Sequence, residues 1–362
     1  MPSLHFTADE NAFVKNWLKI YIEPEGGPQT FHKAVNFSGQ DRHYFKRFLN
    51  LMDNDSLRCA KARKSNQYHR FLKANSRAGR RVKRAGTKLF NLINFASGNT
   101  LDNLQMIGKE EKALTLRVDE ETRKYPWELA YDGKEFLCSR FCIGRKIERP
   151  NSLYLPATDP QNNEALVIGL DYFWDPKNYL SHTKYEARSV ATQLRKHHYH
   201  VNLIEPKDAT IANIKKALSK PVSVFHFTGH GKCRKHYTMG EKVLLQLKDG
   251  PLTSDDLKEC FEKAQGAPFL SFLNACETAM EIYSSELVDA FVDLGAENVI
   301  GTFWSVQDEP AKLFARRFYK SLVNKSTIGQ ALLISRYAGK KDSITWPAFV
   351  FYGDPNQTLP RA

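Results

Sequence analysis

The sequence predicts an α/β protein built on a doubly wound, mostly parallel sheet flanked by helices. The first observation is a rhythm: from about residue 165, short apolar runs such as "ALVIGLD" alternate with amphipathic runs such as "KYEARSVATQLRKHHY". The second is the apolar character of the short runs, which is typical of strands covered on both faces. The third is a hydrophobic content of 42% in 362 residues, which is enough for a substantial core.

Each later element follows the same alternation of apolar and amphipathic runs. The pattern predicts strands at 165–171, 201–206, 222–229, 269–275, 298–304 and 347–354. It predicts helices at 184–199, 209–219, 253–264, 284–295, 309–324 and 327–339, with a hairpin piece at 242–250.

Two regions precede this α/β domain, which we place at residues 161–362. Residues 1–85 are predicted to be a basic helical lead-in, because "TADENAFVKNWLKIYI" opens with capping-box spacing and "DRHYFKRFLNLMD" is amphipathic. Residues 86–160 are predicted to be a small antiparallel unit, because "ALTLRVDEE" alternates and Asp132-Gly133 marks a turn between two apolar runs. A linker rich in Pro, Asn and Asp ends this unit at 156–164.

The net charge of +13 is concentrated in one segment. Residues 58–88 contain twelve Lys or Arg, and no acid occurs between Asp55 and Asp102. One interpretation is a surface for nucleic acid or an acidic partner, with Arg80, Arg81, Lys83 and Arg84 as candidates. The other is a solvated helical face without a partner. The first interpretation leads to an alternative function, a catalytically silent interaction module.

Several classes of protein are not indicated by the sequence. It has no apolar run long enough to span a membrane and no secretory leader, so we expect a cytoplasmic protein. Six scattered cysteines indicate free thiols, and Cys138 and Cys142 have no second pair of ligands for zinc. Phosphate-loop, dinucleotide and H-E-x-x-H motifs are missing, so we expect neither a cofactor nor a metal.

Two reactive side chains follow neighbouring strands of the predicted sheet. "VFHFTG" leads into His230, and "FLSFLNA" leads into Cys276. Because carboxyl ends of parallel strands share one rim, an imidazole and a thiol would meet there, as acyl transfer requires. His226 lies inside its strand, where a core histidine bonded to backbone is the better interpretation. A metal pair of His230 with Cys233 lacks further ligands.

Gly231 has a different use in the same chemistry. Without a Cβ it lets a ligand approach the backbone. Its N–H, together with that of Cys276, would face a developing oxyanion.

Several motifs in order resemble the CHAT domain, a caspase-like cysteine protease family related to separase. They are "SVFHFTGHGK", "LLQLKDGPLTSDDL", "FLSFLNACETA" and "PAFVFYGDP", and the resemblance extends over residues 86–358. It implies a caspase-like fold, peptide-bond hydrolysis, a dyad of His230 and Cys276, and an oxyanion hole at Gly231 and Cys276. It also implies a bacterial antiviral role in which a partner such as a gasdermin or a CRISPR-associated protein is cut in trans. Residues 1–85 show neither the tetratricopeptide repeats nor the signal-sensing module that this family often carries, so we expect activation by a separate protein or nucleic-acid complex.

The resemblance further suggests where a substrate side chain binds. The segment after "NVIGTFW" would line that pocket with Trp304, Ser305 and Asp308, and Asp171 follows the first strand. An inward carboxylate would favour a basic residue before the scissile bond. The alternative for each acid is a helix cap or a surface charge.

Overall fold

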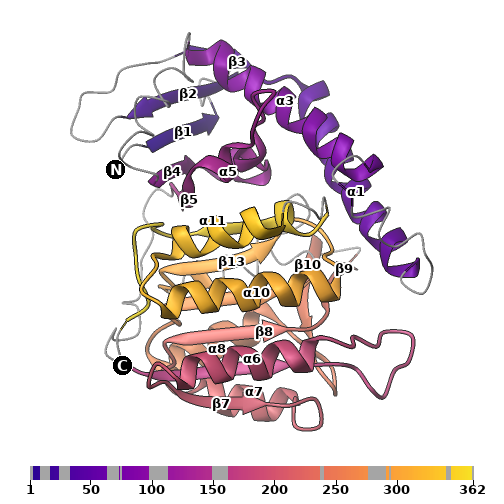
Figure 1. Ribbon diagram of the computed structural model, residues 1–362, viewed down its shortest axis with the longest axis vertical. Helices are drawn as coiled ribbons and strands as arrows, with labels where there is room; N and C mark the ends of the chain where they lie inside the picture. The colour runs from indigo at the N-terminus through magenta and orange to yellow at the C-terminus, as the bar shows by residue number, and fades with distance from the viewer. Residues whose placement is uncertain are drawn as a thin grey trace. The chain divides into compact units, whose positions relative to one another are not determined.

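The computed structural model forms two compact units (Figure 1). Unit 1 comprises Met1–Pro150, Thr327–Pro347 and Tyr352–Gln357, and unit 2 comprises Asn151–Ser326, Ala348–Phe351 and Thr358–Ala362. Residues 1–85 and 86–150 therefore share one unit. The structure describes residues 3–8, 17–23, 33–62, 73, 76–97, 113–148, 162–236, 240–275, 291–292, 295–339 and 344–360.

The strands of unit 1 combine antiparallel and parallel pairs. Their order is β3-β2-β1-β4-β5. β1 pairs antiparallel with β2, and β2 pairs antiparallel with β3, whereas the β1–β4 and β4–β5 pairs are parallel. The strands are β1 (Ser3–Ala8), β2 (Trp17–Glu23), β3 (Lys33–Asn36), β4 (Ala113–Val118) and β5 (Cys142–Ile147).

The predicted helix at 7–22 is wrong at both ends. Its first residues belong to β1 and its last residues to β2, while residues 9–16 lie outside the described part. The run "WLKIYIE" also alternates with a period of two and is rich in aromatic and β-branched residues, which favour strands. Pairing with β1, where Phe6 faces Ile20 across the ladder, selects the extended conformation.

The predicted antiparallel arrangement of residues 86–160 is also wrong. β4 and β5 run parallel, and a crossover of short helical turns at 119–141 joins them. Asp132-Gly133 does form a turn, but the residues beside it make an isolated bridge between Tyr131 and Phe136 and not a pair of strands. A turn signal predicts only a local reversal of the chain. The direction in which two strands pair depends on the whole segment that connects them.

The helices of unit 1 confirm the amphipathic run at 41–53. α1 (Gly39–Lys61) begins at Ser38, whose hydroxyl accepts the backbone N–H of Asp41 in a capping box. α3 (Arg77–Ser97) packs against α1. The remaining helical pieces are η1 (Thr122–Lys124), η2 (Trp127–Leu129), α5 (Leu137–Arg140), α11 (Ile328–Gly339) and η3 (Trp346–Ala348), the last of which crosses the division between the units.

Unit 2 contains the predicted parallel sheet. Its strands lie in the order β13-β12-β8-β6-β7, and every pair within this order is parallel. All residues of β8, β12 and β13 are buried, as strands covered on both faces must be. The strands are β6 (Glu164–Gly169), β7 (His200–Ile204), β8 (Val224–Thr228), β12 (Leu270–Asn274) and β13 (Asn298–Thr302), with β14 (Phe349–Tyr352) beside β13.

Helices cover this sheet in two pairs. α6 packs against α10, and α7 packs against α8 (Figure 1). The chain moves from β6 to β7 in one direction and from β7 to β8 in the other, so right-handed crossovers place α6 and α7 on opposite faces. The helices are α6 (Thr183–Arg195), α7 (Ile211–Leu218), α8 (Ser254–Ala264) and α10 (Asp308–Val323).

The strand order reverses between β6 and β8, which makes this the switch point of the sheet. Ligands of open α/β sheets bind outside the carboxyl ends of strands at such a point. Beyond β8 the chain enters a small antiparallel sheet, which confirms the hairpin piece. Its strands are β9 (Gly231–His236), β10 (Gly240–Gln246) and β11 (Pro251–Leu252). Most of the predicted helix 284–295 lies outside the described residues.

Candidate active site

The candidate site begins where β8 and β12 end side by side. Thr228 pairs with Asn274 at the last rung of their parallel ladder. His230 follows Thr228 by two positions in the sequence, and Cys276 follows Asn274 by two. Cys276 lies outside the described residues, whereas His230 and its surroundings lie within them.

The imidazole of His230 has one nitrogen held by the backbone. Its Nε2 lies 2.7 Å from the carbonyl oxygen of Asn178. A carbonyl oxygen only accepts hydrogen bonds, so Nε2 carries a hydrogen and donates it. In the neutral ring, Nδ1 then keeps the lone pair and is the nitrogen available as a base.

Tyr172 holds the backbone and the ring of His230. Its hydroxyl accepts the backbone N–H of His230 at 2.8 Å and donates to the carbonyl of Gln246 at 2.7 Å. The Tyr172 and His230 rings lie 4.5 Å apart between centroids. Tyr172 adopts a left-handed φ of 55°, an unfavourable conformation for a bulky residue that marks a constrained position.

Gly229 is required by this contact. A Cβ at position 229 would lie 2.8 Å from the hydroxyl of Tyr172. The glycine in "TGHG" therefore lets the tyrosine reach the backbone of His230.

Desolvation lowers the pKa of His230 below the ordinary histidine value, and this is the largest effect on the ring. The hydrogen bond to the Asn178 carbonyl and the carboxylates of Asp308 and Asp175 act in the opposite direction. Because the net shift is downward, the ring is neutral at pH 7 and able to accept a proton.

The loop that carries Asn178 is braced by its own polar groups. The Asp171 carbonyl accepts the N–H of Leu180 at 2.9 Å, and its carboxylate accepts the N–H of Phe173 at 3.3 Å. The Asp175 carboxylate accepts the side-chain amide of Asn178 at 2.7 Å, and this bond lowers the pKa of Asp175. Asp171 thus stabilises the loop next to His230.

Asp308 lies in the first turn of α10 and close enough to His230 for its charge to raise the imidazole pKa. Its carboxylate accepts the backbone N–H of His182 at 3.1 Å. The predicted capping role is shifted by one residue, since the N-cap of α10 is Gln307. An acid in a first helical turn is favoured by the helix dipole, so Asp308 has a local stabilising role as well as its effect on His230.

Of the remaining predicted site residues, the two pocket candidates are buried and the oxyanion-hole glycine is not. Trp304 is fully buried and Ser305 is 6% exposed. Gly231 is partly exposed and begins β9, where it pairs with Leu245. Two exposed aromatic side chains, Phe173 and Trp174, lie on the Asn178 loop instead, with ring centroids 5.1 Å apart.

His226 is a core histidine, as predicted, but its partner is a side chain. Its Nε2 lies 3.1 Å from Oε1 of Glu186 on α6, and Asn274 donates to the same oxygen at 2.7 Å. All three side chains are buried. This Glu186 network joins α6 to β8 and β12, the two strands that precede His230 and Cys276.

Four of the cysteines are buried, and the four predicted basic residues differ in their surroundings. Among the described residues, Cys59, Cys138, Cys142 and Cys260 are buried thiols outside any disulfide, and burial raises the pKa of the Cys260 thiol. The described part holds no cluster of three or more residues able to bind a metal. Arg81 is bound to Asp55 on α1, the ammonium of Lys83 lies 5.6 Å from the ring centre of Tyr131, and Arg80 and Arg84 are exposed.

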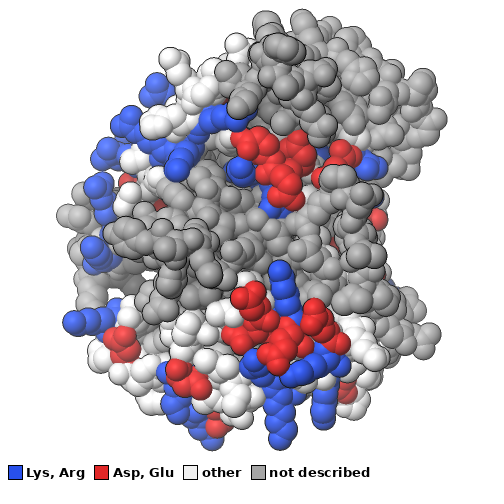
Figure 2. Space-filling model, turned by 180° about the vertical axis from the view of Figure 1, so that it is seen from behind, with Lys and Arg blue, Asp and Glu red and all other residues white. Residues whose placement is uncertain are grey.

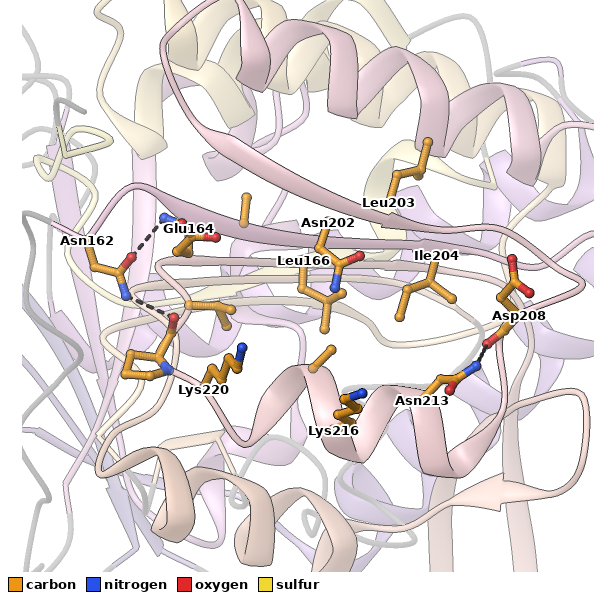
Figure 3. Close-up of a pocket in the computed structure, with 14 residues that line it drawn as sticks. Asn162, Glu164, Leu166, Asn202, Leu203, Ile204, Asp208, Asn213, Lys216 and Lys220 are labelled. Atoms are coloured by element: carbon orange, nitrogen blue, oxygen red, sulfur yellow. Dashed lines mark hydrogen bonds between the residues drawn. The ribbon is translucent and has the colours of Figure 1, made fainter.

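A cavity of about 800 Å³ lies elsewhere in unit 2, between β6, β7 and α7 (Figure 3). Lys216 of α7, Lys220 just beyond that helix and the carboxylates of Glu164 and Asp208 line it. Because two positive and two negative side chains line the cavity, its charge favours neither an anionic nor a cationic ligand. The cavity includes the first residues of β6 and lies away from the strand ends that carry His230.

Sequence reasoning missed three contributors. The Asn178 contact uses a backbone carbonyl, which no residue type reveals. Glu186 looks like any acid of an amphipathic helix. Only Tyr172, an aromatic residue just after a strand end beside Asp171, offered a signal.

No helix in the described part is long and apolar enough to cross a membrane. A search among curated proteins gave no match. Among solved structures, gingipain R, described as an Arg specific cysteine proteinase, superposes with a TM-score of 0.52 and 15% identity over 73% of this chain and 69% of its own. The Saccharomyces cerevisiae separase–securin complex gives a TM-score of 0.59 and 14% identity over 97% of this chain, which spans only 30% of that one.

These likenesses show the fold of caspase-like cysteine proteases. The CHAT domain model matches residues 87–354, which is most of the chain and includes both strand ends of the candidate site. The chain therefore belongs to the CHAT domain family.

Proposed function

We propose that the chain is a cysteine endopeptidase with a catalytic dyad of His230 and Cys276. The observation that carries the proposal is the hydrogen bond from His230 Nε2 to the Asn178 carbonyl, because it leaves Nδ1 of a neutral ring as the base. β8 and β12 end at the same paired position, Thr228 opposite Asn274, and each reactive residue follows its strand by two positions. This register supports the pairing of His230 with Cys276.

In the acylation step, Nδ1 of His230 takes the proton from Sγ of Cys276. The thiolate attacks the carbonyl carbon of the scissile peptide bond, and the oxyanion is met by the backbone N–H groups of Gly231 and Cys276. One such donor contributes about 2.7–4 kcal/mol. The C–N bond then breaks, the imidazolium gives its proton to the leaving amine, and a thioester remains.

In the second step, water attacks the thioester while Nδ1 of His230 takes a proton from it. Cleavage of the C–S bond releases the acid product, and the proton returns to the sulfur. The Asn178 carbonyl holds the Nε2 hydrogen throughout and stabilises the imidazolium that forms in each step.

Labelling with a peptide chloromethyl ketone tests the assignment. The four cysteines described as buried should not react, which leaves Cys233 and Cys276 as the thiols to be distinguished. Cys233→Ser is expected to keep full labelling and Cys276→Ala to lose it. His230→Ala should slow labelling by about 10²-fold or more at pH 7, because it removes the base. Mass spectrometry of tryptic peptides identifies the modified residue.

Labelling of Cys233 in preference to Cys276 would overturn the dyad. Unchanged labelling in His230→Ala would show that the imidazole is not the base, even if Cys276 is the nucleophile. Neither result would affect the fold.

We further propose that a basic residue precedes the scissile bond. The Asp308 carboxylate lies close enough to His230 to affect its pKa, and gingipain R has the same fold and is described as specific for Arg. Asp171, Trp304 and Ser305 are the other residues proposed for this pocket. Fluorogenic peptides ending in Arg, Lys, Ala or Asp test the preference. Asp308→Asn should lower the Arg to Ala ratio of kcat/KM by about tenfold, and an unchanged ratio excludes Asp308.

The family resemblance supports a wider proposal. The substrate is a separate protein, cleaved in trans in the bacterial cytoplasm during antiviral defence, with a gasdermin or a CRISPR-associated protein as the type of target. Co-expression with such a target tests this. A defined fragment should form with the wild-type chain and be missing with Cys276→Ala.

A further inference from the structure

The helices α1 and α3 of unit 1 expose many cations. Both helices are amphipathic: α3 buries Ala78, Val82, Ala85, Leu89 and Ile93 on one side, and its basic residues lie on the other. The exposed Lys and Arg of the two helices are Lys46, Arg47, Arg58, Lys61, Arg77, Arg80, Lys83 and Arg84. We call these eight residues the cationic face.

The acids of the same two helices are too few to balance these cations. Asp41 pairs with Lys88 at 2.5 Å, and buried Asp55 pairs with Arg81. Asp53 is half-buried and is the only other acid of α1 and α3. Figure 2 shows the result: blue side chains extend from the top of the view towards its left edge, along the course that these helices take in Figure 1.

The spacing of the charges fits an extended anion. At 1.5 Å per residue, Lys46 and Lys61 lie about 22 Å apart along α1. On α3, Arg77, Arg80 and Arg84 follow one stripe about 10 Å long. A single phosphate or carboxylate contacts only one or two such groups, whereas a polyanion contacts the whole row.

The composition of the face distinguishes between the two kinds of polyanion. Stable protein interfaces have an apolar or aromatic centre. Among the described residues of α1 and α3, Leu57 is the one large apolar side chain that is highly exposed. A face rich in Arg and Lys and poor in apolar groups is instead typical of binding to phosphates.

We propose that the cationic face binds the phosphodiester backbone of a nucleic acid, without selecting a base sequence. The driving force is the release of counterions as the cations approach successive phosphates. Binding must therefore weaken steeply as salt is raised. The structure also changes the candidate set, because Arg81 is engaged by Asp55 while Arg77 and four residues of α1 join the face.

Fluorescence anisotropy tests the proposal with the full-length Cys276→Ala chain, so that proteolysis plays no part. The probes are a labelled 20-base-pair DNA duplex and single-stranded DNA and RNA of 20 nucleotides. The variant carries Arg77→Gln, Arg80→Gln, Lys83→Gln and Arg84→Gln, and Gln suits these exposed helical positions. It should bind at least tenfold more weakly at 100 mM salt and lower the duplex salt slope by about 3–4.

A matched control removes four positive charges from exposed positions of unit 2, with Lys196→Gln, Lys207→Gln, Lys216→Gln and Lys220→Gln. It should keep the affinity and slope of the parent. A second variant, in which Arg77, Arg80 and Arg84 become Lys, should retain the slope because charge alone is required. Circular dichroism and the Tm confirm that each variant is folded.

Three results would overturn the proposal. One is an absence of binding to all three probes at 50 mM salt. Another is an equal loss in the unit 2 control, which would indicate attraction to the net charge of the chain. The third is equal or tighter binding to poly-glutamate of matched length, which would identify an acidic protein as the partner. The relative affinities of the three probes show which type of nucleic acid is preferred.

Discussion

Two histidines on one strand, His226 within β8 and His230 just beyond it, are held in contrasting ways. His226 is fully buried, and its Nε2 contacts the Glu186 carboxylate that Asn274 also binds. His230 is half-buried, and its Nε2 is held by the Asn178 carbonyl instead. The first contact joins a helix to two strands, whereas the second fixes a tautomer and leaves the other nitrogen for chemistry.

This difference shows that position along the strand decides whether the ring has a structural role or is available for chemistry. β8 ends at Thr228, so the ring of His226 lies on one side of the sheet and that of His230 lies beyond the strand. Within the sheet, α6 and α10 cover that side and exclude water, as the contacts of His226 with Glu186 and Tyr319 show. Beyond the strand end the covering helices give way to a loop, so an imidazole there meets backbone and solvent.

The largest effect is expected from removing the ring outside the strand. His230→Ala should lower kcat/KM for a peptide substrate by about 10²–10⁴-fold, because both proton transfers lose their mediator. The unfolding free energy should fall by less than about 1 kcal/mol, since the ring is half-buried. Peptide hydrolysis and urea unfolding measure the two effects. If His230→Ala lost much stability but the folded variant kept normal turnover, His230 would have a structural role and not a catalytic one.

The opposite pattern is expected from the Glu186 network. Glu186→Ala should lower the unfolding free energy by about 3–5 kcal/mol, because His226 and Asn274 would keep buried donors without an acceptor. Glu186→Gln retains one acceptor oxygen and should lose about 1–2 kcal/mol. Urea denaturation gives both values. If the two variants were equally stable, the acceptor oxygen that Gln retains would have no part in the network.

A smaller effect is expected at Tyr172, which touches only the outer histidine. Tyr172→Phe removes the acceptor of the His230 N–H, at a cost of about 1–1.5 kcal/mol, and should lower kcat/KM about tenfold. Gly229→Ala should act in the same direction, because its Cβ would displace the Tyr172 hydroxyl. Steady-state kinetics on both variants tests the link. Full activity in both would remove Tyr172 from the positioning of His230.

The smallest effect concerns pH. Desolvation lowers the pKa of His230, so the acid limb of kcat/KM is expected below the ordinary histidine value of about 6.5. Asp308 raises this pKa, so Asp308→Asn should move the limb to still lower pH. A pH–rate profile of the two proteins measures the shift. Movement to higher pH would show that Asp308 does not act on the ring through its charge.

The same downward shift has a consequence for stability. Since the unfolded chain binds the imidazole proton at a higher pH than the folded chain, this group lowers stability as pH falls below about 6.5. His230→Ala should reduce that part of the decline. Unfolding free energies at pH 7.5 and 5.5 measure it.

The parallel sheet of unit 2 was predictable because its strands are short, mainly apolar runs and its helices have one apolar face. The N-terminal strands were not, since "WLKIYI" satisfies both helical and strand periods and only pairing with β1 decides between them. The direction of β4 and β5 depends on a crossover of more than twenty residues. Sequence period does not encode that geometry.

The candidate site shows the same limit. His230 was predictable because a polar imidazole follows an apolar strand next to a glycine. The Asn178 carbonyl was not, because every residue has one and only the folded loop brings it to Nε2. Glu186 occupies a helix that also has exposed charges, and its burial depends on the strands beneath it. The pairing of His230 with Cys276 stays a prediction.

The acceptor at position 178 belongs to the main chain, so its chemistry does not depend on which amino acid is encoded there. Exposed side chains of this loop, such as Phe173 and Trp174, can therefore change during evolution, provided that the path of the polypeptide is retained. The side chains of the loop can thus change independently of the carbonyl that holds His230. Grafting this loop between homologues is a practical route to altered selectivity without rebuilding the reaction centre.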